Sequence, residues 1–386
     1  MSFRVLATAD KARRGLLHLP HSMVETPVFM PVGTQGTMKG ILPDQLVDLD
    51  CRILLCNTYH LGHRPGHELV RKAGGVHKMM NWPRGILTDS GGFQMVSLSK
   101  LMTVDEEGVN FESPHTAEMM LLSPEQSIKI QQCLGADIMM QLDHVVHVNT
   151  TGPMVKEAME RSIRWLDRCN EAHTRDDQAL FPIIQGGLDF ELRAACVEEM
   201  AKRAKVGIAI GGLSGGEDKT HFWKVVATCC DLLPPHLPRY VMGVGHPIDL
   251  IMCSLLGADM FDCVYPTRTA RFGTALVRRG GELRLNQKKF ANDFRPIDDR
   301  CDCTTCKNYT RAYLYTVSQK ETVACHLISI HNIKHQLDLM KDCRESISNG
   351  TVTEFLNTFL REQFEGQKVP EWVHEVCDFL GYKIDD

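Results

Sequence analysis

The sequence of 386 residues lacks several features that define common classes of protein. It has no stretch of about 18 consecutive apolar residues, which is the length that a membrane-spanning helix needs. The first residues, MSFRVLATADKARRG, carry charges but no apolar segment typical of a secretory signal. We therefore expect a cytoplasmic protein. No Gly-x-Gly-x-x-Gly motif follows a strand-like run, so nothing supports dinucleotide binding.

A net positive charge is also missing, because the formal net charge is −5 at pH 7. This balance argues against a generally basic nucleic-acid-binding protein. The charge is uneven, however, and residues 264–295 hold eight basic residues against two acids, a local balance of +6. The eight are Arg268, Arg271, Arg278, Arg279, Arg284, Lys288, Lys289 and Arg295. A solvated charged face is one interpretation, and a track for a nucleic-acid backbone is the one we favour.

Cysteine is abundant rather than scarce, with 15 residues. Most stand singly in apolar surroundings, which predicts reduced core thiols in a reducing compartment. The exception is Cys301-x-Cys303-x-x-Cys306, whose spacing predicts a closed, tetrahedral Cys₃His structural zinc site. Three unrelated free thiols are the alternative. His331 is the preferred fourth ligand, although His335 lies on the same helix face. We predict one zinc ion and no redox or nucleotide cofactor.

Short apolar runs alternate with amphipathic segments of helical length, a pattern typical of β-α-β units. The runs are Val28–Val32, Arg52–Cys56, Gly85–Thr88, Ile138–Leu142, Phe181–Ile184, Gly207–Ile210, Tyr240–Gly243 and Met260–Val264. The helical segments are Pro124–Leu134 after a Ser123 cap, Val155–Arg175, Phe190–Ala204, Lys219–Leu233 and Pro247–Leu256. Eight units predict an α/β fold, a (β/α)8 TIM barrel with insertions, and a doubly wound open sheet is the alternative.

Three domains are expected. Residues 1–275 form the barrel, with N-terminal and mid-barrel insertions that include a small hairpin at Val104–Phe111. Residues 276–345 form a basic zinc-binding subdomain, and residues 346–386 form a C-terminal helical segment that packs on the barrel.

The chemistry of a barrel lies at the carboxyl ends of its strands. Here those ends carry Asp89, Asp143 and Asp262, together with Gln185 and several glycines. Three carboxylates, an amide and exposed N–H groups suit a planar heterocycle with several donors and acceptors. Met242 and Phe93 could supply the apolar faces above and below it. For Asp262, a buried ion pair with Arg268 or Arg271 is the alternative explanation.

Several ordered motifs carry a family resemblance. They are Asp-Ser-Gly-Gly-Phe-Gln (89–94), Ile-Ile-Gln-Gly-Gly (183–187), Ile-Gly-Gly-Leu (210–213), Met-Gly-Val-Gly (242–245), Phe-Asp-Cys-Val-Tyr-Pro-Thr-Arg (261–268) and the Cys-x-Cys-x-x-Cys…His set. Together they resemble the tRNA-guanine transglycosylases over about residues 1–340. Ser-Gly-Gly-Glu (214–217) is similar to the eukaryotic branch, in which a glycine at position 215 leaves room for queuine.

The resemblance implies a pentosyltransferase that exchanges guanine 34 for queuine in tRNAs with a GUN anticodon, those of the Asp, Asn, His and Tyr type. Asp262 matches the nucleophile that attacks C1′, and Asp89 matches the general acid/base. Two displacements at one carbon retain configuration, as in retaining glycosidases. The positions that match the base site are Asn57, Phe93, Asp143, Gln185, Gly212, Leu213, Gly215 and Met242. The positions that match the nucleotide-holding segment are Arg268, Thr269 and Arg271.

One position departs from the resemblance. Relatives generally carry a second acid after the position of Asp143, and here it is His144. The resemblance also implies a heterodimer with a related non-catalytic subunit, with a homodimer as the alternative, and peripheral association with the mitochondrial outer membrane.

Two other functions compete with base exchange. A non-catalytic RNA-binding partner subunit need not keep Asp89 and Asp262, so their presence disfavours it. A metal-dependent barrel hydrolase needs histidine ligands at the strand ends. His60 and His144 are there, but no His-x-His pair follows the first strand.

Overall fold

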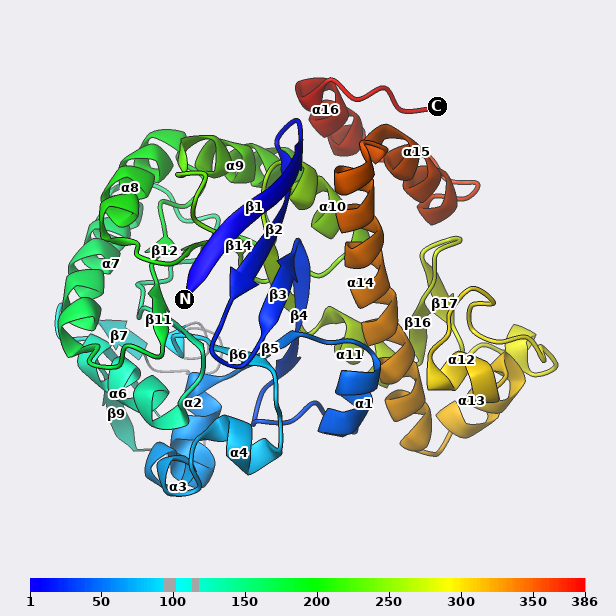
Figure 1. Cartoon of the computed structure of the whole chain (residues 1–386), viewed down its shortest axis with the longest axis horizontal. Helices are drawn as coiled ribbons and strands as arrows, with labels where there is room; N and C mark the ends of the chain where they lie inside the picture. The colour runs from blue at the N-terminus through cyan, green and yellow to red at the C-terminus, as the bar shows by residue number, and fades with distance from the viewer. Residues whose placement is uncertain (93–101, 113–117, 386) are drawn as a thin grey trace.

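The computed structural model describes residues 1–92, 102–112 and 118–385. Its centre is a ring of parallel strands surrounded by helices (Figure 1). The strands of the ring are β4 (Val28–Gly33), β5 (Ile53–Cys56), β6 (Gly85–Thr88), β10 (Ile138–Met140), β11 (Ala179–Phe181), β12 (Ile183–Ile184), β13 (Ile208–Ile210), β14 (Arg239–Val241) and β15 (Met260–Cys263). β15 pairs with β4, so the last strand of the ring meets the first. The predicted (β/α)8 TIM barrel is confirmed.

Nine segments occupy the eight predicted runs because Pro182 interrupts one of them. β11 pairs with β10, and β12 pairs with β13. Proline has no N–H for the ladder, but its carbonyl still accepts a hydrogen bond from Ala209 N at 2.8 Å. The interrupted run therefore pairs with β10 before the proline and with β13 after it, which keeps the ring of strands continuous.

Two apolar layers hold the barrel together. Alternate strand residues, including Met30, Leu55 and Met260, point inward and form the interior core. The residues between them pack outward against the helices. Strands that are buried on both faces read as continuous apolar runs, which is why the periodicity predicted them well.

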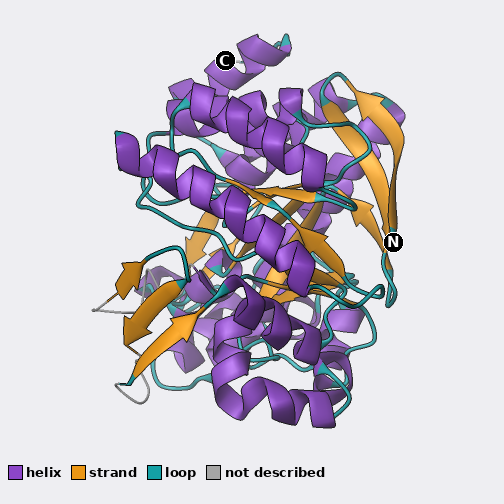
Figure 2. Ribbon diagram, turned by 90° about the vertical axis from the view of Figure 1, so that its left-hand side faces the viewer, coloured by secondary structure: helices purple, strands orange, loops and turns teal. Residues whose placement is uncertain are grey.

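Small antiparallel sheets lie at the two ends of the barrel (Figure 2). The first comprises β1 (Ser2–Ala9), β2 (Ala12–His18) and β3 (Met23–Thr26), and its Leu17 and Val24 join the interior core. The second comprises β7 (Met102–Val104), β8 (Val109–Glu112) and β9 (Met119–Leu122). The predicted hairpin is confirmed in β7 and β8, where Asp105 N donates to Gly108 O at 3.1 Å.

The predicted helices are present with small shifts at their ends. They are α6 (Pro124–Leu134), α7 (Pro153–Ala172), α8 (Phe190–Arg203), α9 (Lys219–Leu232) and α10 (Pro247–Leu255). The shorter helical segments that precede them are α1 (Pro43–Asp48), α2 (Thr58–Leu61), η1 (Gly62–Gly66), α3 (His67–Lys72) and α4 (Val76–Met80). The Ser123 side chain accepts from Gln126 N, and the Gln126 side chain accepts from Ser123 N, which is the expected capping box.

The C-terminal part leaves the barrel after β15 and returns to it. Its elements are α11 (Tyr265–Arg271), β16 (Thr274–Leu276), β17 (Glu282–Arg284), η2 (Lys288–Phe290), α12 (Thr304–Asn308), α13 (Arg311–Ser318), α14 (Val323–Asn349), α15 (Val352–Gln363) and α16 (Glu371–Leu380). α14 packs against β4, α10 and α11 along the side of the barrel (Figure 1). The boundary expected between residues 345 and 346 falls inside this helix. Among the described helices, none combines the length and the hydropathy that a membrane crossing requires.

Candidate active site

The strand-end residues share the inward face of the barrel wall. Side chains of a strand alternate between its two faces. Asp89 stands two positions after the interior residue Leu87, and Asp262 stands two positions after Met260. The same step leads from interior core residues to Asn57, Gln185 and Met242. The polar site is therefore the last inward layer of the barrel, laid over an apolar interior.

Asp262 is held by two donors at the end of β15. The Tyr240 hydroxyl donates to Asp262 Oδ1 at 2.5 Å, and Gly243 N donates to the same oxygen at 2.9 Å. Burial raises the pKa of the carboxyl group, and these two hydrogen bonds counteract that rise. No ion pair joins Asp262 to any arginine in the described part of the chain. The ion-pair explanation for its presence is therefore wrong.

Asp89 is fixed by backbone and side-chain donors that follow β5 and β6. Asn57 Nδ2 donates to Asp89 Oδ2 at 2.5 Å, and Thr58 N donates to Oδ1 at 2.9 Å. Asp89 and Asp262 both stand in the last inward layer of the barrel. Burial raises the pKa of the Tyr240 phenol, and the charges of both carboxylates raise it further. Two carboxylates thus lie at the barrel mouth.

Asp143, Gln185 and Gly212 form a row across three neighbouring strand ends. Gln185 Nε2 donates to Asp143 Oδ2 at 2.6 Å, and Ser90 Oγ donates to Asp143 Oδ1 at 3.2 Å. Burial raises the pKa of Asp143 to about 6. Gly212 has a φ of +68°, and a Cβ there would lie 2.3 Å from Gln185 Oε1. Only glycine fits at this position.

The other positions expected at the base site surround this row. Met242 and Leu213 are half-buried, and Gly215 is exposed. A Cβ on Gly215 would approach Val148 Cγ1 to 3.1 Å, so a larger residue would crowd this wall. The Glu217 carboxylate accepts from Ser214 N and Gly215 N, at 2.6 and 2.9 Å, which fixes the turn. Phe93 lies outside the described residues.

His144 turns toward α7. Its backbone N–H donates to Ser162 Oγ at 2.9 Å, and its Nδ1 lies 3.2 Å from Arg161 Nη1. Burial, followed by the charge of Arg161, lowers the pKa of His144 to about 4. The imidazole is thus neutral at pH 7, and Nδ1 accepts from the arginine. Position 144, where the family resemblance implies a second acid, is therefore uncharged here.

The basic segment begins on α11. Arg268 and Arg271 are exposed, and Thr269 Oγ1 donates to Tyr265 O at 2.9 Å. Two of the eight basic residues are paired, Arg278 with Asp342 and Arg295 with Asp293. The other six have no carboxylate partner among the described residues; they are Arg268, Arg271, Arg279, Arg284, Lys288 and Lys289. Exposed Phe272 and Phe294 lie within the same segment.

Four residues form the predicted metal centre. The ligand atoms of Cys301, Cys303, Cys306 and His331 all lie within 4.8 Å of one another. His331 Nδ1 faces the Cys306 thiol at 3.2 Å, and its Nε2 lies 2.7 Å from Leu276 O. A metal-bound histidine commonly donates its second N–H to such a carbonyl, so the tautomer is already set. The quartet fits a closed structural zinc ion, and His331 is the fourth ligand.

His326 and His335 lie outside this quartet. The His326 ring packs over Gly40, where a Cβ would lie 2.0 Å from the ring. His335 is buried, and its Nδ1 has no partner in the described residues.

Three participants were not predicted. Tyr240 appears in the sequence as a strand residue, and only the polar end of an aromatic residue in an apolar run could have marked it. Ser90 contacts Asp143 across 53 positions of sequence, which no local pattern shows. Arg193, in α8, donates to carbonyl groups beside Gln185 and Gly212.

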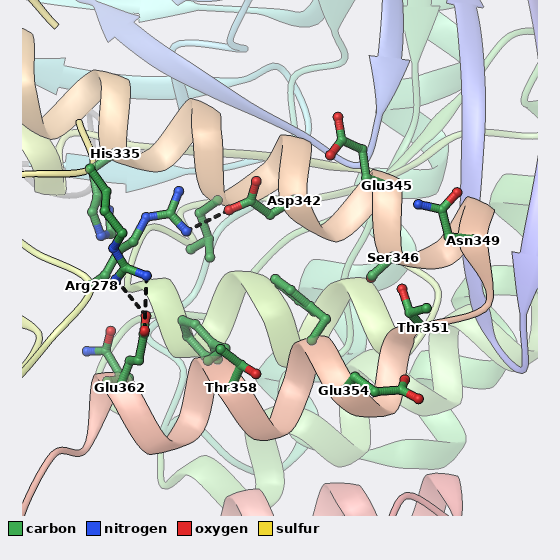
Figure 3. A pocket seen from close by; sticks show the side chains of 15 residues that line it. Arg278, His335, Asp342, Glu345, Ser346, Asn349, Thr351, Glu354, Thr358 and Glu362 are labelled. Atoms are coloured by element: carbon green, nitrogen blue, oxygen red, sulfur yellow. Dashed lines mark hydrogen bonds and ion pairs between the residues drawn. The ribbon is translucent and has the colours of Figure 1, made fainter. Parts of the chain in front are cut away.

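A cavity of about 400 Å³ lies elsewhere, between α14 and α15 (Figure 3). Its charged lining is largely paired, since Arg278 meets Asp342 at 2.7 Å and Arg300 meets Glu362 at 2.8 Å. None of the described residues that line it belongs to the strand-end site. The cavity is therefore separate from the strand-end site.

Fold and site define a class of protein. A (β/α)8 barrel carries paired carboxylates at its mouth, a row of groups suited to a planar base, and an adjoining basic subdomain with a Cys₃His centre. This combination fits an enzyme that transfers a glycosyl group on a nucleic acid.

The comparisons with known proteins give the family. The family model described as Queuine tRNA-ribosyltransferase matches residues 9–365. The queuine tRNA-ribosyltransferase catalytic subunit of Caenorhabditis elegans is 71% identical over 100% of both chains. The corresponding subunit of Schizosaccharomyces pombe is 53% identical over 96% of this chain and 95% of its own. The queuine tRNA-ribosyltransferase of Thermus thermophilus is 46% identical over 98% of both chains. The chain belongs to the queuine tRNA-ribosyltransferase family.

Proposed function

We propose that this chain exchanges guanine 34 of tRNAs with a GUN anticodon for queuine, through a covalent ribosyl–aspartate intermediate. The observation that carries the proposal is a pair of carboxylates in the last inward layer of the barrel, Asp262 bound by Tyr240 and Asp89 bound by Asn57. They stand beside the base-sized row of Asp143, Gln185 and Gly212. An exchanged base has to leave its stack, so the substrate is an anticodon loop with the target nucleotide turned outward.

Asp262 is the nucleophile. Tyr240 and Gly243 both donate to Oδ1, which leaves Oδ2 without a hydrogen bond among the described residues. Oδ2 attacks C1′ of the ribose, the bond from C1′ to N9 breaks, and its electron pair goes to the departing guanine. Asp89 supplies the proton that neutralises guanine. Asp89 then accepts a proton from queuine, whose ring nitrogen attacks C1′ and releases Asp262.

The row of base-reading groups sets the specificity. Asp143 accepts from the amino edge of the base, and Gln185 and Gly212 N–H face its O6 side. Asn57 fixes Asp89, while Met242 and Phe93 stack on the ring. The exposed Gly215 leaves space for the ring system that distinguishes queuine from its smaller precursor.

The basic segment holds the RNA. Arg268, Thr269 and Arg271 bind the nucleotides beside position 34, and the zinc centre stabilises the subdomain that continues this track. The chain works as a heterodimer with a related non-catalytic subunit, with a homodimer as the alternative. We place it in the cytoplasm, with peripheral association at the mitochondrial outer membrane.

A guanine-displacement assay tests the proposal. Wild-type protein, with and without a partner subunit, is given tRNA carrying labelled guanine 34 and then queuine or its smaller precursor. Release of label and a preference for queuine are expected. The Asp262→Ala variant should release nothing and form no RNA–protein adduct, and full exchange by that variant would disprove the nucleophile assignment.

The same assay separates this function from its competitors. A non-catalytic RNA-binding subunit would bind tRNA and release no guanine under any condition. A metal-dependent hydrolase would need three ligands at the strand ends. No such group occurs there among the described residues, and the ring of His144 is turned away to Arg161.

A further inference from the structure

Arg193 is a fully buried arginine in the first turns of α8, directly behind the ends of β12 and β13. No carboxylate lies within ion-pair distance of it in the described part of the chain. An unpaired buried charge is costly, and burial lowers the pKa of this guanidinium accordingly. The position therefore needs a compensating role.

The guanidinium ties two loops together. Arg193 Nε donates to Gly187 O at 2.8 Å, and Nη1 donates to Ile184 O at 3.0 Å and to Gly211 O at 2.8 Å. Two of these carbonyls flank Gln185, and the third immediately precedes Gly212. A planar fork with fixed donor directions can hold three carbonyls in one arrangement, which a flexible ammonium group cannot.

These contacts determine where one N–H points. In a trans peptide the carbonyl and the N–H point in opposite directions. Because Gly211 O is directed toward Arg193 and α8, Gly212 N–H is directed away from them. Both residues of this peptide are glycines, and Gly212 has a φ of +68°, so the backbone itself opposes rotation of the peptide only weakly.

We propose that Arg193 is a positioning residue, which holds the Gly211–Gly212 peptide so that its N–H reads an oxygen acceptor on the six-membered ring of the base. This inference rests on the proposed function, in which Gly212 N–H faces O6. The ligands that benefit are guanine-like purines and deazapurines with a carbonyl at that position. The charge of Arg193 also polarises the peptide that it holds, which strengthens the N–H as a donor.

Inhibition constants of two free bases against tRNA guanine exchange test the proposal. Guanine and 6-thioguanine share the amino edge and the protonated ring nitrogen, but sulfur at position 6 is the weaker acceptor. Arg193→Met keeps the volume of the side chain and removes its donors. The inhibition constant of guanine should rise about tenfold, the effect of one misdirected hydrogen bond, while that of 6-thioguanine changes less. The preference for guanine should therefore shrink.

A purely structural role would have a different result. Loss of folded protein lowers the concentration of active enzyme, which leaves both inhibition constants unchanged. Arg239→Met is the matched control. Arg239 is also buried and also donates to carbonyl groups, those of Gly257 and Leu233. It is the first residue of β14, whereas the candidate site lies at the carboxyl ends of the strands. It should keep the wild-type preference.

Arg193→Lys is the second variant, and it decides the matter if Arg193→Met does not fold. It keeps the positive charge and loses the planar set of donors. The preference for guanine over 6-thioguanine should therefore decrease, but by less than in Arg193→Met. A wild-type preference in a folded Arg193 variant, or an equal contraction in Arg239→Met, would overturn the inference. Absence of guanine exchange in the wild-type protein would instead refute the proposed function.

Discussion

Asp262 Oδ1 accepts hydrogen bonds from the Tyr240 hydroxyl and from Gly243 N. The substitution Tyr240→Phe removes the shorter of these two bonds. In Tyr240→Phe the pKa of Asp262 should rise further, because a hydrogen bond that favours the charged form is lost. A protonated carboxyl group cannot attack C1′, so activity should be lost on the acid side. The acid limb of the pH–rate profile should therefore move to higher pH.

Tyr382→Phe serves as the control for this profile. Tyr382 is also buried but lies near the C-terminus, after α16. Its variant should keep the wild-type profile. A Tyr240→Phe protein with reduced activity but an unshifted acid limb would show that the hydroxyl acts on Asp262 by position alone.

We expect Asp143 to make base affinity and fold stability depend on pH in opposite directions. Its pKa is raised to about 6, so the carboxylate proposed to accept from the base is present above that pH and is lost below it. Affinity for guanine should therefore fall as the pH drops through about 6. The folded-state pKa lies above the unfolded one, so the charged form destabilises the fold above pH 6, and this cost disappears as the pH falls.

Asp143→Asn separates these two effects. The variant should bind guanine at least tenfold more weakly at pH 7.5, because the amide offers a donor where the base needs an acceptor. Its free energy of unfolding should be unchanged or higher by on the order of 1–2 kcal/mol, since the buried charge is gone. Calorimetric binding and thermal unfolding across pH 5–8 measure both. Equal affinity of wild type and variant would remove Asp143 from base recognition.

At the scale of single residues, the sequence predicted the carboxylates and missed their partners. Asp262 stands out because it interrupts an apolar run, and Asp89 because it directly follows one at the carboxyl end of a predicted strand. Tyr240 and Ser90 act across strands, so their roles depend on a register that only the folded barrel defines. Arg193 was missed because an arginine in a helix is ordinarily an exposed residue.

At the scale of elements, the buried strands were predictable because both of their faces are apolar. The break at Pro182 was not, since a proline inside a run argues against a central strand unless the ring changes partner there. The sheet β1–β3 also escaped prediction. Its strands carry charged residues, and β1 alternates exposed with half-buried positions, so no continuous apolar run marks it.

The zinc quartet supports a prediction about one element. Cys306→Ser should lose bound zinc and release His331, whose Nε2 meets Leu276 O at the end of β16. The subdomain adjoins α11 through α14, since Asn332 Nδ2 donates to Pro266 O at 2.9 Å and to Thr274 O at 3.0 Å. We expect tRNA affinity to fall about tenfold or more, while guanine binding at the barrel mouth persists.

Metal analysis, tRNA binding and guanine calorimetry measure the three parts of this prediction. Cys377→Ser is the control, because Cys377 is a free thiol on α16, outside the quartet. A Cys306→Ser protein that keeps a full equivalent of zinc would contradict the ligand assignment.

At the scale of the whole molecule, α14 joins the two functional regions. This helix of 27 residues carries His331, a member of the metal centre. Further along it, Gln336 Nε2 donates to Gly245 O at 2.5 Å, beside the strand end that holds Met242. Composition and periodicity indicated a barrel followed by an appendage. They could not show that the chain returns, because the helix that closes the barrel begins about 60 residues after its last strand.

The six unpaired basic residues allow a prediction of how tRNA binding should depend on salt concentration. Each contact with a single-stranded phosphate contributes about −0.7 to the slope of log affinity against log salt concentration. Arg268→Ala should weaken tRNA binding and make this slope shallower by about 0.7, and the double variant Lys288→Ala/Lys289→Ala by about twice that amount.

Arg4→Ala is the control, because Arg4 is an exposed residue of β1, at the other end of the barrel, and its variant should keep the wild-type slope. All three proteins should unfold at the wild-type temperature, since none of these side chains is buried. An unchanged slope in both track variants would place the RNA on another face, whereas a loss of stability in Arg268→Ala would show that this arginine holds the fold and not the phosphate.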